Sequence, residues 1–264
     1  MTAKSPRLTA IGSGKGGTGK TFVSLSLAKC FARRGEKVLV CDADLGLSNT
    51  SVQLGLASGG NLPALLSGRL SFEDAVVHVP GTISGLDLLA APAGSGQLAD
   101  AGEKIAERLL TLLLSAHKYD RVVLDLGAGV GPGTMAIAAG AEDTLAVTTP
   151  DPAAITDAYA FVKLMARRTG GRMPSLVVNR AASASEAERT AEALKTASRT
   201  FLRTVPDYLG FVPDDPKALE AIRRQKSIIE IAPQSPAAMA VDALAELLMR
   251  NPAKKSRETA PSIR

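Results

Sequence analysis

The sequence contains no tryptophan, and aromatic residues make up only 3% of its 264 residues. Hydrophobic residues nevertheless account for 45% of the chain, so a core has to be built from alanine, valine, leucine and isoleucine. A chain of this length can bury a substantial core and is sufficient for one large α/β domain.

Other absences restrict the class of protein. No apolar run reaches the ~18 residues that a membrane-spanning helix requires. The first residues, MTAKSPRL, lack the apolar segment of a secretory signal peptide. The two cysteines, Cys30 and Cys41, lack C-x-x-C spacing and are expected to be buried and reduced. These features favour a cytoplasmic protein.

Charge of either sign is not strongly in excess. The formal net charge is +5 and the pI is about 9.3. A modest basic excess is typical of a solvated surface, and the alternative is weak attraction to nucleic acid or to anionic lipid.

The most specific feature that is present is a glycine-rich motif. Residues 14–21 read GKGGTGKT and match the phosphate-binding loop G-x-x-x-x-G-K-[ST] at every fixed position. The glycines let successive backbone N–H groups surround a polyphosphate, and the following helix adds the positive end of its dipole. Lys20 is expected to neutralise the β- and γ-phosphates, and the Thr21 hydroxyl is expected to bind Mg²⁺. An additional lysine, Lys15, follows the first glycine, although Lys20 already supplies the charge that the loop needs.

The flanks of the loop have the context that this motif requires. Residues 7–12 form a short apolar strand, and residues 21–34 form a helix that Gly35 ends. Further apolar strands are predicted at 37–42, 86–90, 120–126, 144–149, 175–179 and 208–212. Helices are predicted at about 98–117, 133–140, 153–169, 185–203, 215–224 and 236–250. This order indicates a single doubly wound, mostly parallel α/β sheet within residues 1–250, followed by a disordered basic tail at 251–264.

Acidic side chains follow two of the predicted strands, where such sheets place their functional residues. The second strand ends in Asp42 and Asp44, of which one could hold a metal-bound water and the other could orient the attacking water. Asp125 ends the strand at 120–126 and suits a position near Mg²⁺. The glycines after it suit a loop that senses the γ-phosphate.

The ends of two later strands carry candidates for recognition of the nucleotide base. Asn179 ends the strand at 175–179, and its amide could pair with the edge of adenine. Pro213, Asp214 and Asp215 follow the next strand and could close the other side of the base.

These motifs resemble the MinD/ParA family of ATPases with a deviant Walker A loop, whose form is KGGTGKT. CDADLGLSN resembles the DxD segment of that family, and DLGAG resembles its DxxxG switch. The resemblance implies a P-loop fold in which two subunits enclose two ATP molecules. It further implies that Lys15 contacts phosphates in the partner's site, that Asp44 positions water, and that Asp42 and Asp125 lie near the metal.

The expected site therefore has three parts. The catalytic residues are Lys15, Lys20 and Asp44, and the metal residues are Thr21, Asp42 and Asp125. The residues expected to bind ATP are Gly14, Gly16, Gly17, Thr18, Gly19, Lys20, Thr21, Phe22, Asn179, Pro213 and Asp214.

Within the family, the chain resembles the FlhG group, which controls flagellar number and placement. The similar segments are ADLGLSNTSVQLGL, GGNLPALLSGRLSFEDAV, TTPDPAAITDAYAFVKLM and YLGFVPDDPKALEAIRRQKSIIEIAPQSPAA. This resemblance implies an ATP-dependent homodimer, in the cytoplasm or peripheral at the inner membrane or cell pole. The partners that it implies are an FlhF-like GTPase, flagellar switch proteins of the C-ring or a flagellar transcription regulator.

The sequence departs from the FlhG group at two places. MTAKSPRLTA contains no DQAxxLR-type sequence, through which these proteins stimulate FlhF. Members of the FlhG group, like MinD, end in an amphipathic helix that binds membrane. The last predicted helix here, PAAMAVDALAELLMR, has Asp242 and Glu246 on its polar side, whereas a lipid-binding helix favours a Lys/Arg-rich polar face. We therefore expect this helix to pack in the domain, and weak lipid contact only at Lys254, Lys255 and Arg257.

Three alternatives share the scaffold. A ParA-type partition ATPase would bind DNA nonspecifically as an ATP dimer, and it would use basic residues such as Arg167, Arg168, Arg172, Arg223 and Arg224. A metabolic enzyme that transfers a phosphoryl group would need a second substrate pocket. An iron–sulfur relative would need a cluster site that Cys30 and Cys41 do not provide.

Overall fold

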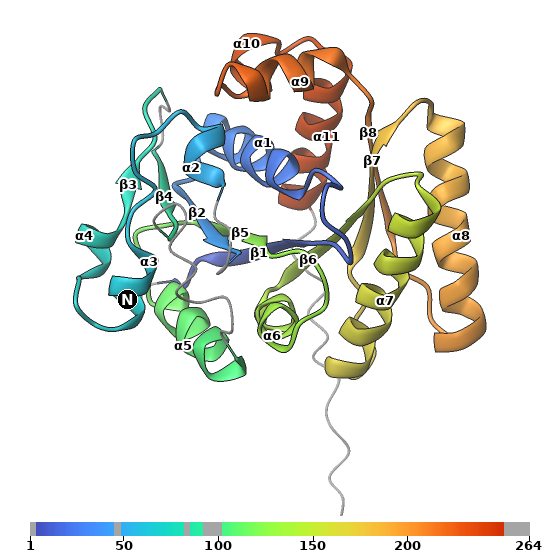
Figure 1. Cartoon of the computed structure of the whole chain (residues 1–264), viewed down its shortest axis with the longest axis horizontal. Coiled ribbons are helices and arrows are strands. Elements are labelled where there is room, and N and C mark those ends of the chain that lie inside the picture. Colours follow the sequence, from blue (N-terminus) through green and yellow to red (C-terminus); the bar gives the residue numbers. More distant parts are fainter. Residues whose placement is uncertain (1–3, 45–48, 82–84, 92–101, 251–264) are drawn as a thin grey trace, which may run out of the picture.

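A single eight-stranded sheet organises the chain, which we describe from a computed structural model over residues 4–44, 49–81, 85–91 and 102–250 (Figure 1). The strands lie in the order β3-β4-β2-β5-β1-β6-β7-β8, and only β3 runs antiparallel to its neighbour. Their bounds are β1 Arg7–Gly12, β2 Val38–Ala43, β3 Val77–His78, β4 Leu86–Leu89, β5 Arg121–Leu126, β6 Asp143–Thr148, β7 Ser175–Ala181 and β8 Tyr208–Pro213.

Helices cover both faces of this sheet. Figure 1 shows α1, α9, α10 and α11 above it, and α5, α6 and α7 below it. The helices are α1 Lys20–Arg33, α2 Thr50–Gln53, α3 Leu62–Leu66, α4 Phe72–Ala75, α5 Glu103–Leu114, α6 Pro132–Gly140, α7 Pro152–Arg168, α8 Ala184–Leu202, α9 Pro216–Arg223, α10 Ile228–Ile231 and α11 Pro236–Arg250. Within the described ranges, no helix is both long and apolar enough to cross a membrane.

Two apolar layers, one on each face, form the core. On the α1 side, Val23, Leu27 and Phe31 are fully buried, and they belong to one cluster with side chains of β2, β5 and α11. On the other side, residues of α5, α6 and α7 form a second cluster with the alternate residues of the same strands. The central strands are therefore buried on both faces, which explains their continuous apolar sequences.

The predicted doubly wound α/β fold is confirmed, and each of the seven predicted strands is present. Gly35, which has φ of 99°, follows the end of α1 as expected, and Cys30 and Cys41 are both buried and free. β3 and the short helices α2, α3, α4 and α10 were not predicted from the sequence. These elements have two to five residues, so none of them is long enough to show a hydrophobic period.

Two predictions fall partly or wholly outside the described residues. The predicted helix at 98–117 begins there, and its described part is the shorter helix α5. The predicted tail at 251–264 lies wholly outside them.

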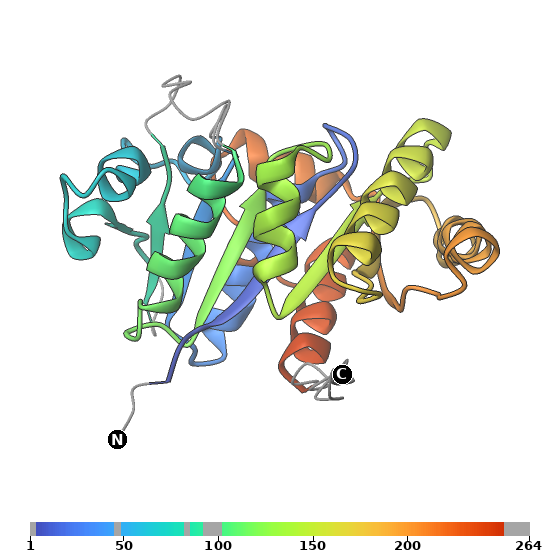
Figure 2. The ribbon, with the colours of Figure 1, turned by 90° about the horizontal axis from the view of Figure 1, so that it is seen from below.

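The parallel strands all point to one edge of the sheet. Figure 2 shows their arrowheads at this edge, where the loop between β1 and α1 also lies. Because β2 pairs with β5, and β5 pairs with β1, the residues that follow these strands meet beside the loop. The predicted site residues that follow β1, β2 and β5 therefore lie together at the carboxyl ends of the strands.

Candidate functional site

The phosphate loop fits tightly against its neighbours, which explains two of its glycines. A Cβ atom at Gly14 would lie 1.9 Å from the carbonyl oxygen of Asp157 in α7. Gly19 has φ of 86°, and a Cβ atom there would lie 2.2 Å from Nδ2 of Asn179. Any larger residue would therefore displace the loop, so both glycines are required by close approach.

Side chains outside the motif hold the backbone of the loop. Ser13 Oγ donates a hydrogen bond to the carbonyl oxygen of Lys15 at 2.6 Å, and Asn179 Nδ2 donates to that of Thr18 at 2.8 Å. Thr18 Oγ1 is buried, and within the part of the chain that the structure describes it has no hydrogen-bond partner. A buried hydroxyl whose hydrogen-bonding capacity is unused suits a loop that surrounds the oxygens of a polyphosphate.

Lys20 lies at the start of α1 among carboxylates. It is 9% exposed, and its burial lowers the pKa of the ammonium, whereas the charges of Asp125 and Asp44 raise it. A buried cation next to carboxylates is well placed to accept an anion in the loop.

Asp42 and Asp125 are paired in register where β2 and β5 lie side by side. Ser24 Oγ donates to Asp125 Oδ1 at 2.9 Å, and the Thr21 hydroxyl lies close enough to this carboxyl to act against a rise of its pKa. Burial, and secondarily the charge of Asp42, raises the pKa of Asp125 to about 7. The structure thus brings the three predicted metal residues together.

Asp44 follows β2 beside this cluster. Its backbone N–H donates to Asp42 Oδ1 at 3.0 Å, and a Cβ atom at Gly127 would lie 3.5 Å from its carboxyl carbon. Asp42 Oδ2 in turn accepts a hydrogen bond from Thr50 Oγ1 at 2.8 Å, which ties α2 to the carboxylates. Residues 45–48 of the DxD segment lie outside the described residues.

The oxygen atoms of this cluster suit Mg²⁺, a hard cation that binds one or two carboxylates and completes its shell with phosphates and water. Among the described residues, no group of three or more His, Cys, Asp or Glu is arranged to hold a metal ion by itself.

The raised pKa of Asp125 predicts how stability depends on pH. A carboxyl whose pKa is higher in the folded than in the unfolded state makes the fold less stable as pH rises from about 4 to about 7. Asp125→Asn should therefore stabilise the nucleotide-free protein at pH 8, by no more than about 4 kcal/mol, and should leave its stability unchanged below about pH 4.

Urea unfolding in the presence of a chelator, from pH 4 to pH 8, checks this prediction. The exposed carboxylate variant Glu188→Gln is the control and should follow the wild type. An Asp125→Asn curve parallel to that of the wild type would show that Asp125 titrates normally.

Lys15 is more exposed than Lys20 and has an acidic partner of its own. Its Nζ atom is 3.5 Å from Asp151 Oδ1, and the two side chains are 41% and 55% exposed. Asp151 also caps α7 by accepting hydrogen bonds from the N–H groups of Ala153 and Ala154. Lys15 thus has an ion-pair partner within its own chain, which the sequence did not suggest.

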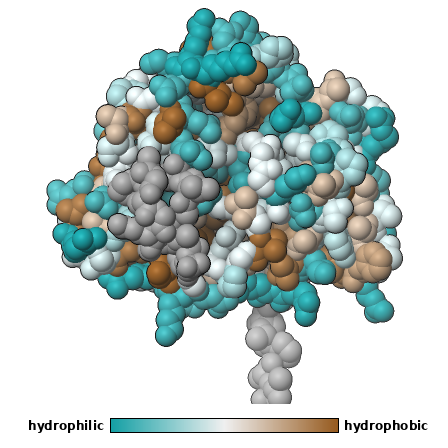
Figure 3. All heavy atoms as spheres, in the orientation of Figure 1, coloured by the Kyte–Doolittle hydropathy of each residue, from teal (hydrophilic) through white to brown (hydrophobic). Residues whose placement is uncertain are grey.

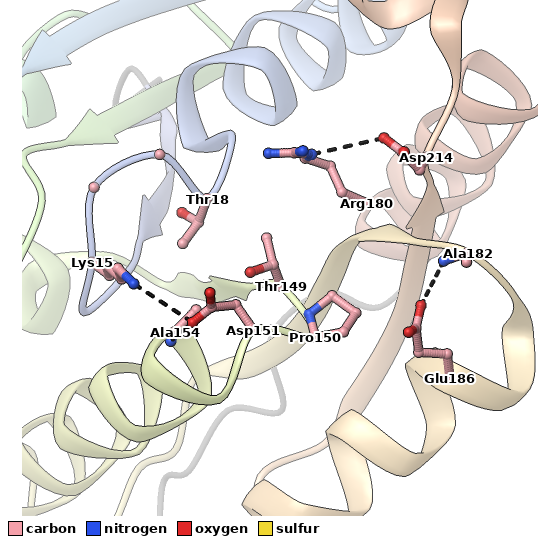
Figure 4. A pocket seen from close by; sticks show the side chains of 12 residues that line it. Lys15, Thr18, Thr149, Pro150, Asp151, Ala154, Arg180, Ala182, Glu186 and Asp214 are labelled. Atoms are coloured by element: carbon pink, nitrogen blue, oxygen red, sulfur yellow. Dashed lines mark hydrogen bonds and ion pairs between the residues drawn. The ribbon is translucent and has the colours of Figure 1, made fainter.

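An open cavity of about 440 Å³ extends from Lys15 toward β8 (Figure 4). It is lined by residues at the end of β7 and by residues that follow β1, β6, β7 and β8. They are Lys15, Gly16, Gly17, Thr18, Thr149, Pro150, Asp151, Ala154, Arg180, Ala182, Glu186 and Asp214.

The predicted base-binding residues take different positions. Asn179 is 3% exposed and holds the loop, whereas Asp214 lines the cavity and Pro213 ends β8. Asp215 instead accepts hydrogen bonds from the N–H groups of Lys217 and Ala237, so it joins α9 to α11. Phe22, expected at the nucleotide, packs against the core cluster on the α1 side.

A family model described as the CobQ/CobB/MinD/ParA nucleotide-binding domain matches residues 9–228, which include every element of the site. The chain belongs to this family. It is 32% identical over 241 residues to "Antiactivator FleN" of Pseudomonas aeruginosa. The matched region covers 91% of this chain and 85% of that protein. It is also 32% identical to "Flagellum site-determining protein YlxH" of Helicobacter pylori, over 92% of this chain and 82% of that protein.

Solved structures of family members agree with the fold. The cell division ATPase MinD of Pyrococcus furiosus has a TM-score of 0.76 and 27% identity, covering 92% of this chain and 98% of its own. MinD of Pyrococcus horikoshii, complexed with Mg-ADP, has a TM-score of 0.75 and 26% identity, with coverage of 92% and 95%. The prediction of a P-loop ATP hydrolase of the MinD/ParA type is confirmed.

The structure also bears on the alternatives. Of the arginines on which DNA binding would depend, Arg168 pairs with Glu103, Arg224 pairs with Glu220, and Arg172 donates to carbonyl oxygens of Ala139 and Ala141. The charges of Arg168 and Arg224 are therefore offset by carboxylates, whereas Arg172 is held by neutral carbonyl groups and keeps its charge. Cys30 and Cys41 are buried on separate elements, α1 and β2, and are unsuited to a shared cluster.

Proposed function

We propose that this ATPase works as an ATP-switched homodimer that regulates flagellar number and placement. The observation that carries the switch is that Lys15 is exposed while Lys20 is buried. The flagellar role is supported by the similarity to FleN and YlxH over more than nine-tenths of the chain.

In this mechanism the N–H groups of the phosphate loop and the ammonium of Lys20 bind the triphosphate of ATP. Thr21, Asp42 and Asp125 would hold Mg²⁺, which supplies positive charge that offsets charge on the phosphates. Asp44 orients the attacking water, and its own backbone is fixed by the bond to Asp42. Lys15 leaves Asp151 and contacts the nucleotide of the partner subunit.

The proposal includes a protein partner and a place in the cell. The Pseudomonas relative is named an antiactivator, which among the candidates favours a flagellar transcription regulator. An FlhF-like GTPase and C-ring proteins remain the other candidates. We place the protein in the cytoplasm, or peripherally at the inner membrane or cell pole.

Lys15→Ala should abolish dimerisation while ATP binding is retained. The variant protein should still bind ATP through Lys20, but it lacks the cation that would contact the nucleotide of the second subunit. The measurement is light scattering with ATP and Mg²⁺, in the Asp44→Ala background, which should accumulate the dimer because hydrolysis is blocked. Dimers that persist in the double variant would contradict the bridging role.

The flagellar role is tested in a deletion strain. Cells that lack the protein should carry an altered number of flagella, and wild-type protein should restore the number whereas Lys15→Ala should not. A normal number of flagella in the deletion strain would contradict this role.

A further inference from the structure

Helix α9 exposes its largest apolar side chains. Leu219 is 50% exposed and Ile222 is 38% exposed, and they lie three residues apart on the helix. The side that faces the domain carries alanine instead, since Ala221 is buried and Ala218 packs against the core cluster on the α1 side. Folding alone favours the reverse arrangement, because burial of leucine or isoleucine stabilises a protein more than burial of alanine. The outward apolar pair therefore indicates a contact with something outside the domain.

Basic side chains surround this apolar pair. Arg223 ends α9 and Lys226 lies in the turn after it; both are exposed, and within the described ranges neither forms an ion pair. Lys217 and Arg224 share a single carboxylate, that of Glu220, at 2.7 Å and 2.9 Å. Four cationic side chains therefore face one carboxylate, and the surface has an excess of positive charge.

The backbone keeps Lys226 close to the end of the helix. Gln225 has φ of 53°, and its N–H donates to the carbonyl oxygen of Ile222 at 3.0 Å. The N–H of Lys226 donates to the carbonyl oxygen of Ala221, also at 3.0 Å. These two bonds form a Schellman motif, which ends a helix and turns the chain. The α9 surface, as we call it, comprises Lys217, Leu219, Ile222, Arg223, Arg224 and Lys226.

The α9 surface lies at one end of the molecule. Figure 1 shows α9 and α10 at the top, above α1, and Figure 3 shows hydrophobic side chains beside strongly hydrophilic ones at this end. A projecting helix with apolar residues inside a basic rim has the pattern of a helix that lies on an anionic membrane.

Other occupants fit this surface less well. A second copy of the chain would bring two surfaces of like charge together, which is unfavourable. A stable protein interface buries about 800 Å² on each partner around an apolar centre, which is more than two apolar side chains provide. DNA would engage the cations through its phosphates, but it would leave Leu219 and Ile222 without an apolar partner.

We propose that the α9 surface binds membranes that contain anionic lipid. Leu219 and Ile222 enter the boundary between headgroups and acyl chains, and the cationic side chains pair with lipid phosphates. This contact is separate from α11 and from the basic residues after Arg250. The inference goes beyond the proposed function, and it depends neither on ATP hydrolysis and dimerisation nor on the flagellar role.

Sedimentation with lipid vesicles tests the proposal on the whole chain. The protein should bind vesicles of phosphatidylglycerol and phosphatidylcholine in equal amounts, should not bind phosphatidylcholine alone, and should bind less as salt increases. The double variant Leu219→Ser, Ile222→Ser removes the apolar pair and keeps the charge. The double variant Arg223→Glu, Lys226→Glu reverses two charges and keeps the apolar pair. Each should weaken binding by about tenfold or more.

Matched double variants elsewhere in the chain are the controls. Phe201→Ser, Val205→Ser removes two apolar side chains, 73% and 38% exposed, at the end of α8 and just after it. Lys104→Glu, Arg108→Glu reverses two exposed cations on α5, which covers the other face of the sheet. Both should bind vesicles as the wild type does, because the total change in hydrophobicity or charge is similar but its place differs.

The absence of tryptophan allows a direct measurement at one position. Leu219→Trp introduces a single tryptophan, whose emission should shift to shorter wavelength with phosphatidylglycerol vesicles because the indole leaves water. Phe201→Trp is the control and should show no shift. All these substitutions change exposed side chains, so the fold should persist.

Four outcomes would overturn the proposal. The first is a wild-type protein that binds no vesicle, and the second is binding that survives both α9 double variants. The third is loss of binding in Lys254→Glu, Lys255→Glu alone, which would place the lipid contact after α11. The fourth is retention on DNA without vesicle binding, lost in Arg223→Glu, Lys226→Glu, which would identify a nucleic-acid surface instead.

Discussion

Asp44→Ala should lower the rate of ATP hydrolysis by ~10²-fold or more, the usual scale for a positioned acid–base group, while ATP affinity stays close to that of the wild type. Asp44 lies beside Gly127 at the end of β5, and its backbone is held by the carboxylate of Asp42. Removing its side chain therefore affects the orientation of water without removing a group of the phosphate loop.

Phosphate release measures the rate, and titration with a fluorescent ATP analogue measures the affinity. Glu188→Ala, which removes an exposed carboxylate from α8, is the control and should hydrolyse ATP normally. Normal turnover in Asp44→Ala would contradict the role of this residue in hydrolysis. Lost ATP binding would mean instead that Asp44 holds the nucleotide.

Lys20→Ala should lower ATP affinity by roughly 10²-fold, because charged hydrogen bonds of about 3 kcal/mol are lost. The cost is increased because Lys20 also neutralises Asp125 and Asp44, whose negative charges would then face the phosphates directly. The same analogue titration, performed at low and at high Mg²⁺ concentration, checks this prediction.

Lys15→Ala is the matched control for Lys20→Ala, since it removes a lysine from the same loop. Lys15 is exposed and paired with Asp151, so its loss should leave the affinity of the monomer for ATP nearly unchanged. Equal losses in the two variants would show that both lysines contact phosphates of the same subunit.

Much of this site was predictable because its chemistry is local in sequence. Residues 14–21 carry the glycines, the lysine and the hydroxyl in one segment, and a buried strand precedes them. Asp42, Asp44 and Asp125 could be predicted because parallel strands deliver their carboxyl ends to a common edge. The residues that hold the loop were not predictable, since Ser13 precedes the motif with no distinguishing pattern.

The base side of the site was harder to predict for a different reason. Asn179 and Arg180 lie near the end of β7 and Asp215 follows β8, and sequence does not distinguish a ligand contact from a structural bond at such positions. Asp215 joins two helices and Asn179 holds the loop, whereas Arg180 lines the cavity. Asn179 and Arg180 lie at an irregularity in the pairing of β7 with β8, and such an irregularity has no clear sequence signal.

The sequence by itself determined the α/β class, the parallel core and the phosphate loop, because hydrophobic period and loop chemistry depend on neighbouring residues. Only the tertiary structure decided which charged groups meet. It placed Lys15 against Asp151, 136 positions later in the chain, and it buried Asp125 beside Asp42. Burial, and secondarily the charge of Asp42, raises the pKa of Asp125 to about 7. Such pairings depend on strand order and on burial, and electrostatic energies are set by distance and solvent exposure in space rather than by separation along the chain.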